Sequence, residues 1–152
     1  MVVYRIVKSA NAHDLSGTGP RLYGGRWNPK GVSVIYTSES RALAALEFYV
    51  HLSRTVILPG LSVVSIEIPD SVSRKEIAAA DLPKDWRTYP APPELPAIGA
   101  EWVRSRVTLL LFVPSAIMPP ERNVLINPLH PEMKEVQITG IEEYALDQRL
   151  IS

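Results

Sequence analysis

A segment rich in glycine and proline, residues 17–31, most restricts the fold that this chain can adopt. Its sequence is GTGPRLYGGRWNPKG, and it holds five of the eight glycines together with two prolines. This composition breaks regular structure, so we expect a loop whose backbone takes positive φ angles or closely approaches a ligand. The β-branched runs on either side, at 2–7 and 32–38, predict strands. The glycine-rich segment is therefore a long, irregular connection between two strands.

The remaining pattern predicts an α+β fold with a mixed or mostly antiparallel sheet flanked by short helices. Ser38 or Ser40 is expected to cap a helix that continues to residue 52. Further along, we expect a half-exposed strand at 61–69, helical turns at 74–80 and 98–107, and a surface loop or subdomain boundary around the prolines of 83–96. After these, we expect a buried strand at 107–116 ended by Pro114 and extended pieces at 124–128 and 133–138. The 152 residues suffice for a single domain, 1–152.

Charge and cysteine content exclude several classes of function. Sixteen basic and sixteen acidic residues give no net charge, which disfavours a dedicated nucleic-acid-binding protein. Residues 1–60 carry seven basic and three acidic side chains, so an anionic ligand is expected there. The chain has no cysteine, and its three histidines lack the spacing of metal ligands, so no metal site is expected. No long apolar run or signal-peptide pattern is present, which indicates a soluble, cytoplasmic protein.

A carboxylate interrupts the apolar face of the first predicted helix. Leu43, Leu46 and Val50 define the expected buried stripe, and Glu47 falls on that stripe. A carboxylate in this position is costly unless it is paired. Two interpretations stay open: Glu47 is a functional group in a cavity, or it lies at the edge of the stripe, where it reaches solvent or pairs with His51.

The glycine-rich segment also carries a candidate anion-binding residue. Arg26 can present a planar donor fork to a phosphate or carboxylate, with free backbone N–H groups beside it. The segment matches neither a P-loop nor the dinucleotide-binding fingerprint. The alternative is structural, with Arg26 paired to Glu47 and Trp27 filling the core. Tyr36 and Ser115 are likewise either packing and turn residues or groups that strands deliver into a site.

Several segments together resemble the RES-domain family, which supplies the toxin of bacterial RES-Xre type II toxin-antitoxin modules. The resemblance spans residues 4 to 138 and rests on YRI at 4–6, LSGTG at 15–19, GGRWNPKG at 24–31, VIYTSES at 34–40, ALAALEFYVHL at 42–52, VPSA at 113–116 and NVLINPLHP at 123–131. It implies a single RES domain with a fold similar to ADP-ribosyltransferases.

The resemblance also implies which residues act. Arg26, Glu47 and Ser115 match the arginine, glutamate and serine for which the family is named, and Tyr36 matches its active-site tyrosine. Further candidates for substrate binding are Arg5, Trp27, Asn28, His51 and Asn127. Members use NAD as a substrate rather than as a cofactor. They degrade it by hydrolysis or phosphorolysis or, in some relatives, transfer ADP-ribose to a protein.

These implications form one functional hypothesis. Glu47 stabilises the cation that forms on the ribose, Arg26 holds the NAD phosphates, Tyr36 walls the nicotinamide, and Ser115 binds near the ribose or positions Glu47. The family implies an Xre-type antitoxin that covers the active site and forms a hetero-oligomer with the chain, whereas nucleic acid and membranes are not expected as direct partners. The competing hypothesis is a binding module in which Glu47 and Arg26 form only an ion pair.

Overall fold

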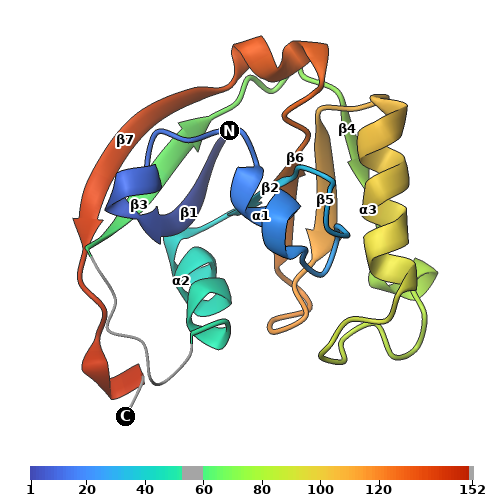
Figure 1. The fold of residues 1–152 in the computed structure, drawn as a ribbon, viewed down its shortest axis with the longest axis horizontal. Helices are drawn as coiled ribbons and strands as arrows, with labels where there is room; N and C mark the ends of the chain where they lie inside the picture. Colours follow the sequence, from blue (N-terminus) through green and yellow to red (C-terminus); the bar gives the residue numbers. More distant parts are fainter. Residues whose placement is uncertain (53–59, 151–152) are drawn as a thin grey trace.

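The computed structural model describes residues 1–52 and 60–150 and is built on a seven-stranded mixed sheet (Figure 1). Among the described strand pairs only β4–β5 is parallel, which confirms the predicted α+β class. In the order β4-β5-β6-β2-β1-β3-β7, the strands are Arg74–Glu76, Leu110–Pro114, Arg122–Ile126, Ile35–Ser38, Val2–Lys8, Leu61–Glu67 and Gln137–Tyr144. The helices are α1 (Thr18–Tyr23), α2 (Arg41–Val50) and α3 (Glu94–Ser105), with 3-10 turns at Ser9–Asn11, Ala79–Asp81, Pro131–Glu135 and Gln148–Leu150.

The two central strands of the sheet are joined at only one position. β1 pairs with β3 along its whole length, whereas its register with β2 consists of the single pair Tyr4 and Ser38. The sheet therefore consists of two parts, β4-β5-β6-β2 and β1-β3-β7, which meet at what we call the sheet junction. On either side of that contact, the facing edges of β1 and β2 form no further register pair.

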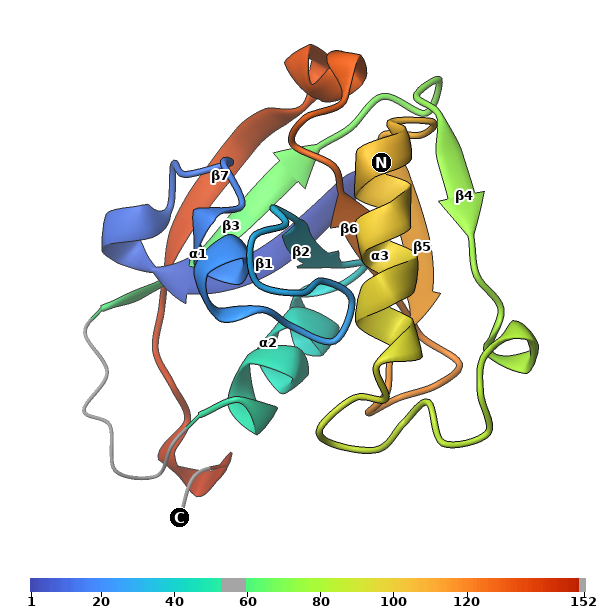
Figure 2. The same cartoon turned by 45° about the vertical axis from the view of Figure 1, so that its right-hand side comes forward.

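Each helix packs on a different part of the sheet (Figures 1 and 2). α3 lies along β5 and β6, where Leu95 and Val103 pack with Leu111 and Leu125. α2 lies beside β1 and β3. Its contacts belong to a second cluster, made by Ile6, Ala44, Leu61 and Val63. None of the described helices is long and apolar enough to span a membrane.

The strand–loop–helix unit around α2 forms largely as predicted. Ser40 is the N-cap, and its hydroxyl accepts a hydrogen bond from the backbone N–H of Leu43. The predicted buried stripe is wrong at Val50, which is 54% exposed. Leu43 and Ala44 are the buried residues of the helix, so its inward face is rotated toward Ala44.

Two predictions for the middle of the chain are wrong. Residues 61–69 were expected to form a half-exposed strand, but Leu61 to Ile66 are all buried, because α2 covers one face of β3 and the main core covers the other. The helical turns expected at 74–80 are instead the short strand β4 followed by a 3-10 turn. Parallel pairing with β5 overrides the helical propensity of this segment.

Two further segments differ in detail from the sequence-based expectation. The glycine-rich segment contains a short helix, α1, which lies between Gly17 and Gly24. Both glycines have positive φ, as does Gly31, so the backbone expectation is confirmed even though the segment is not all loop. At 133–138, the extended piece begins only at Gln137, because His130 and Pro131 start a 3-10 turn.

Candidate active site

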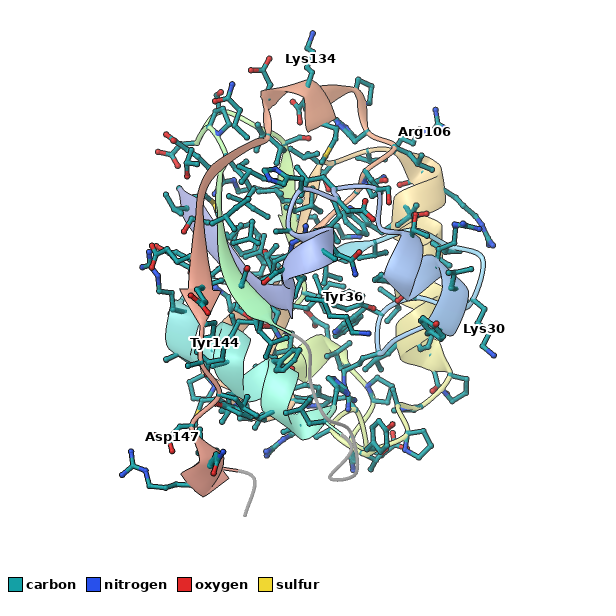
Figure 3. The ribbon with its side chains drawn as sticks, turned by 60° about the vertical axis from the view of Figure 1, so that its left-hand side comes forward. Lys30, Tyr36, Arg106, Lys134, Tyr144 and Asp147 are labelled. Carbon is teal, nitrogen blue, oxygen red and sulfur yellow. The ribbon has the colours of Figure 1, made fainter. Side chains whose placement is uncertain are left out.

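A cavity of about 580 Å³ opens at the sheet junction. β1 contributes Tyr4 and Arg5 to its wall, and β2 contributes residues 36–38. Glu47 of α2 and Arg26 of the glycine-rich segment line it from further sides. Figure 3 shows Tyr36 at the middle of the molecule, between α2 and the glycine-rich segment. Residues that are far apart in sequence therefore meet where β1 and β2 part.

Glu47 is held in this cavity by two neutral donors. Its Oε1 accepts a hydrogen bond of 2.7 Å from the hydroxyl of Ser115 and another of 2.7 Å from the side-chain amide of Asn123. Asn123 is fixed in turn, because its own Oδ1 accepts a hydrogen bond from the hydroxyl of Ser38. One carboxylate oxygen is thus held by two protein donors, whereas Oε2 has no hydrogen-bond partner among the described residues.

The interpretations that pair Glu47 with a neighbouring cation do not match this arrangement. Within residues 1–52 and 60–150, Glu47 forms no ion pair with Arg26 or His51. Glu47 is near enough for its charge to act on Arg26 without a direct contact between the two side chains. A ligand that carries positive charge can therefore approach the carboxylate without displacing a cation.

Ser115 lies behind Glu47 rather than at the cavity surface. Ser115 is 0% exposed, and its hydroxyl accepts hydrogen bonds from the backbone N–H groups of Ile117 and Met118 while donating to Glu47. Pro114 and Ala116 line the cavity, but Ser115 does not. Of the two roles left open for Ser115, this geometry favours positioning of Glu47.

Arg26 is presented to the cavity by the backbone around it. One terminal guanidinium nitrogen, Nη1, donates a hydrogen bond of 2.7 Å to the carbonyl oxygen of Trp86, which leaves the other donors of the fork available. Burial lowers the pKa of Arg26 from its ordinary value, and the charge of Glu47 opposes this shift. A desolvated guanidinium with unused donors is well suited to bind an anion.

Tyr36 holds the glycine-rich segment in place. Its hydroxyl donates to Oδ1 of Asn28 and accepts a hydrogen bond of 3.0 Å from the backbone N–H of Trp27. Burial raises the pKa of Tyr36 well above its ordinary value, so the hydroxyl keeps its proton. Gly25 has no room for a side chain, since a Cβ there would lie 2.7 Å from this hydroxyl. Tyr36 thus lines the cavity with its ring and fixes the backbone next to Arg26 with its oxygen.

Tyr36→Phe is expected to destabilise the protein by about 2 kcal/mol, because the Trp27 N–H and Asn28 Oδ1 both lose their partner in a buried place. Urea denaturation of the variant measures this loss. Tyr4→Phe is the matched control, since Tyr4 also lines the cavity but its hydroxyl has no hydrogen-bond partner in the described part of the chain. Equal stability of the two variants would contradict the anchoring role of the Tyr36 hydroxyl.

The other substrate-binding candidates divide into two groups. Arg5, Trp27 and His51 line the cavity. Arg5 uses Nη2 to hold the carbonyl oxygens of Ala12 and Asp14, and its buried Nε has no partner among the described residues. Trp27 is only 2% exposed, because its indole packs in the core cluster beneath α3.

Asn28 and Asn127 are not brought to the cavity surface. The side-chain amide nitrogen of Asn28 donates to the carbonyl oxygens of Pro20, Pro29 and Val32, so this residue shapes the glycine-rich segment from inside. Asn127 is 0% exposed and donates to the carbonyl oxygen of Val103 on α3. Both asparagines satisfy buried backbone groups.

The sequence analysis missed Asn123 and Ser38 as parts of the site. Both belong to segments that carry the family resemblance, NVLINPLHP and VIYTSES. Only their position in the sheet marks them as site residues. Ser38 of β2 pairs with Asn123 of β6, and both lie at ends of strands that lead to the cavity. Without the strand pairing, nothing in the sequence connects Asn123 to Glu47.

Comparison with known proteins finds a family and several close relatives. The model of the family described as RES domain matches residues 2–147. A protein of Sphingobium sp. (strain YBL2) named Prs ADP-ribosylating toxin is 41% identical over 146 residues, covering 95% of this chain and 91% of its own length. Proteins named Toxin Res from Yersinia enterocolitica and Pseudomonas putida are 39% and 40% identical, and in each case 99% of both chains is covered.

A solved structure supports the fold at lower sequence similarity. The toxin-antitoxin complex MbcT-MbcA of M. tuberculosis contains a chain that matches with a TM-score of 0.78. The match is 18% identical and covers 94% of this chain and 83% of that chain. At this level of identity the likeness concerns the fold alone, and it agrees with the mixed sheet and few helices described above.

Proposed function

The chain belongs to the RES-domain family, and from this premise we propose that it is the toxin of a toxin-antitoxin pair and that it cleaves the bond between nicotinamide and ribose in NAD. The observation that carries the proposal is the half-buried carboxylate of Glu47, fixed by Ser115 and Asn123 in a cavity that it shares with Arg26. The names of the relatives support the proposal that the chain is a toxin, and the residues of the cavity support the proposal that it cleaves NAD.

The chemistry requires one well-placed negative charge. As the bond between the pyridinium nitrogen and C1′ of the ribose breaks, nicotinamide leaves with the electron pair and becomes neutral, and positive charge spreads over the ribose ring. Oε2 of Glu47 would stabilise this charge and accept a hydrogen bond from a ribose hydroxyl. The leaving group needs no proton, so a single carboxylate suffices. Water then attacks C1′ and loses a proton, or an anionic oxygen of phosphate attacks C1′ and needs to lose none.

Arg26 would bind the phosphates of NAD. Its free guanidinium donors lie in the same cavity as Glu47, and the residues at 1–60 carry the excess of positive charge. Tyr36 would limit the space for the nicotinamide, while its hydroxyl keeps the backbone beside Arg26 in place. These roles divide substrate binding between the glycine-rich segment and β2.

Arg26→Ala is expected to raise the KM for NAD about tenfold or more and to lower kcat as well, because a phosphate contact acts in both the bound substrate and the transition state. Steady-state kinetics of nicotinamide release measure both constants. Arg21→Ala, which removes a positive charge from exposed α1 without lining the cavity, serves as the control. An unchanged KM with a strongly reduced kcat would contradict phosphate binding by Arg26.

Transfer of ADP-ribose to a protein is the second candidate function. It is favoured by the relative that is 41% identical and carries the name Prs ADP-ribosylating toxin. The two activities share the cleavage step and differ in the acceptor that attacks C1′. Glu47 and Arg26 would serve both.

The test uses the purified chain, free of antitoxin, with NAD in the presence and absence of phosphate. Release of nicotinamide together with free ADP-ribose supports hydrolysis, and a rate that depends on phosphate supports phosphorolysis. Transfer of label from NAD to a protein in a cell lysate supports ADP-ribosylation. A folded chain that neither releases nicotinamide nor transfers label would refute cleavage of NAD and favour the binding module.

The partner that we propose is an Xre-type antitoxin. The structural neighbour is a toxin-antitoxin complex, and the relatives named Toxin Res cover nearly the whole chain. A bound antitoxin would be expected to block access of NAD to the cavity, so the complex should release nicotinamide more slowly than the free chain.

A further inference from the structure

Two tyrosines at the cavity are exposed to solvent to a degree that packing does not explain. Tyr23, the last residue of α1, is 80% exposed, and Tyr89, in the loop that leads to α3, is 82% exposed. In contrast, Tyr36 is mostly buried and hydrogen-bonded. Tyrosine usually buries its ring, so exposed rings beside a cavity point to a ligand.

Both rings lie next to residues of the proposed substrate site. Tyr23 itself lines the cavity. Tyr89 contacts His51, another cavity residue, with 6.5 Å between the ring centroids. This ring contact places Tyr89 at the C-terminal end of α2, where His51 is the C-cap. One exposed ring therefore belongs to the cavity wall, and the other contacts a residue of that wall.

We propose that Tyr23 and Tyr89 form an aromatic mouth that stacks on the adenine of NAD and makes the site selective for a dinucleotide. The proposal rests on the proposed function, which puts the nicotinamide ribose at Glu47 and the phosphates at Arg26. The adenosine half of NAD extends away from the reacting bond beyond the phosphates, and Tyr23 lines the same cavity as Arg26 while Tyr89 contacts the cavity residue His51. Stacking of a base on an aromatic ring requires only an open ring face, which both tyrosines provide.

Binding of a nucleotide base explains the exposed rings better than binding of a partner protein does. Tyr23 and His51, the residue that Tyr89 contacts, line one cavity with Glu47 and with Arg26, a cation suited to phosphate. A planar base linked to a diphosphate matches this combination of aromatic rings, a cation and a carboxylate. Docking of a protein through the same rings is the competing outcome, and it makes a different prediction for ligand binding.

The test measures the affinity of the folded chain for ADP-ribose, which contains adenine and both phosphates, by titration calorimetry. Tyr23→Ala and Tyr89→Ala should each weaken binding about tenfold, whereas Tyr23→Phe and Tyr89→Phe keep the ring and should bind as the wild type does. Leu129→Ala, at a residue that is 53% exposed and does not line the cavity, should have no effect. In NAD cleavage, the alanine variants should raise KM and retain kcat.

Three outcomes would overturn the aromatic mouth: alanine variants that bind ADP-ribose as tightly as the wild type, phenylalanine variants that bind as weakly as the alanine variants, or a wild type that does not bind ADP-ribose. Alanine variants with unchanged ADP-ribose affinity but weaker antitoxin binding would assign the rings to a protein surface instead. Failure of the proposed function is a separate result, because it appears as absent nicotinamide release and transfer, whatever the affinity for ADP-ribose.

Discussion

Glu47→Gln is expected to lower the rate of nicotinamide release from NAD about a thousandfold while leaving the fold intact. The substitution removes the negative charge that would stabilise the cationic ribose, and loss of one such group costs about a hundredfold to a thousandfold in rate. The shape of the side chain is kept. Its amide oxygen can still accept the hydrogen bonds from Ser115 and Asn123, so the free energy of unfolding should change by no more than about 1 kcal/mol.

The measurement combines single-turnover kinetics with thermal or urea denaturation of the same preparation. Glu39→Gln is the matched control, because it removes one carboxylate charge just before the same helix. Glu39 is exposed and pairs with Arg122 at 2.7 Å, outside the cavity. Its loss should cost less than about 1 kcal/mol in stability and nothing in rate. If Glu47→Gln lost activity only in proportion to folded protein, Glu47 would be a structural residue.

Much of the site could be predicted because each residue breaks a local rule. Glu47 stood out as a carboxylate on a helix face that was otherwise apolar, and Arg26 as a cation within a glycine-rich segment. The partners of Glu47 could not be found in this way. Ser115 directly follows β5 and Asn123 lies near the start of β6, and only the pairing of β5 with β6 and of β6 with β2 brings them to α2.

The same limit explains the errors in the fold. The alternation in 61–69 is real, but whether the polar positions face water depends on what covers the second face, and Ser62 and Ser65 are buried. Likewise, residues 74–76 become a strand because the edge of β5 is available to them. Local patterns predicted the strand at β1 and the helix α2, where burial and capping agree within one segment.

The close approach of α3 to the glycine-rich segment leads to the second large expected effect. Gly99, in the middle of α3, lies directly against the backbone of Trp27, and a Cβ at this position would overlap the Trp27 carbonyl oxygen. A helix propensity argument predicts that Gly99→Ala gains about 1 kcal/mol in stability. We expect the opposite, a loss of about 3 kcal/mol, because the helix or the glycine-rich segment must move.

Gly19→Ala is the control that separates the two arguments. Gly19 is also helical, and a Cβ there would meet nothing within 4 Å, so this variant should be as stable as the wild type or slightly more stable. Denaturation curves of both variants test the contact. Because Arg26 immediately precedes Trp27, a displaced segment should also raise the KM for NAD in Gly99→Ala, since Arg26 no longer lies at its place in the cavity. Equal stability of Gly99→Ala and Gly19→Ala would mean that α3 does not support the segment that carries Arg26.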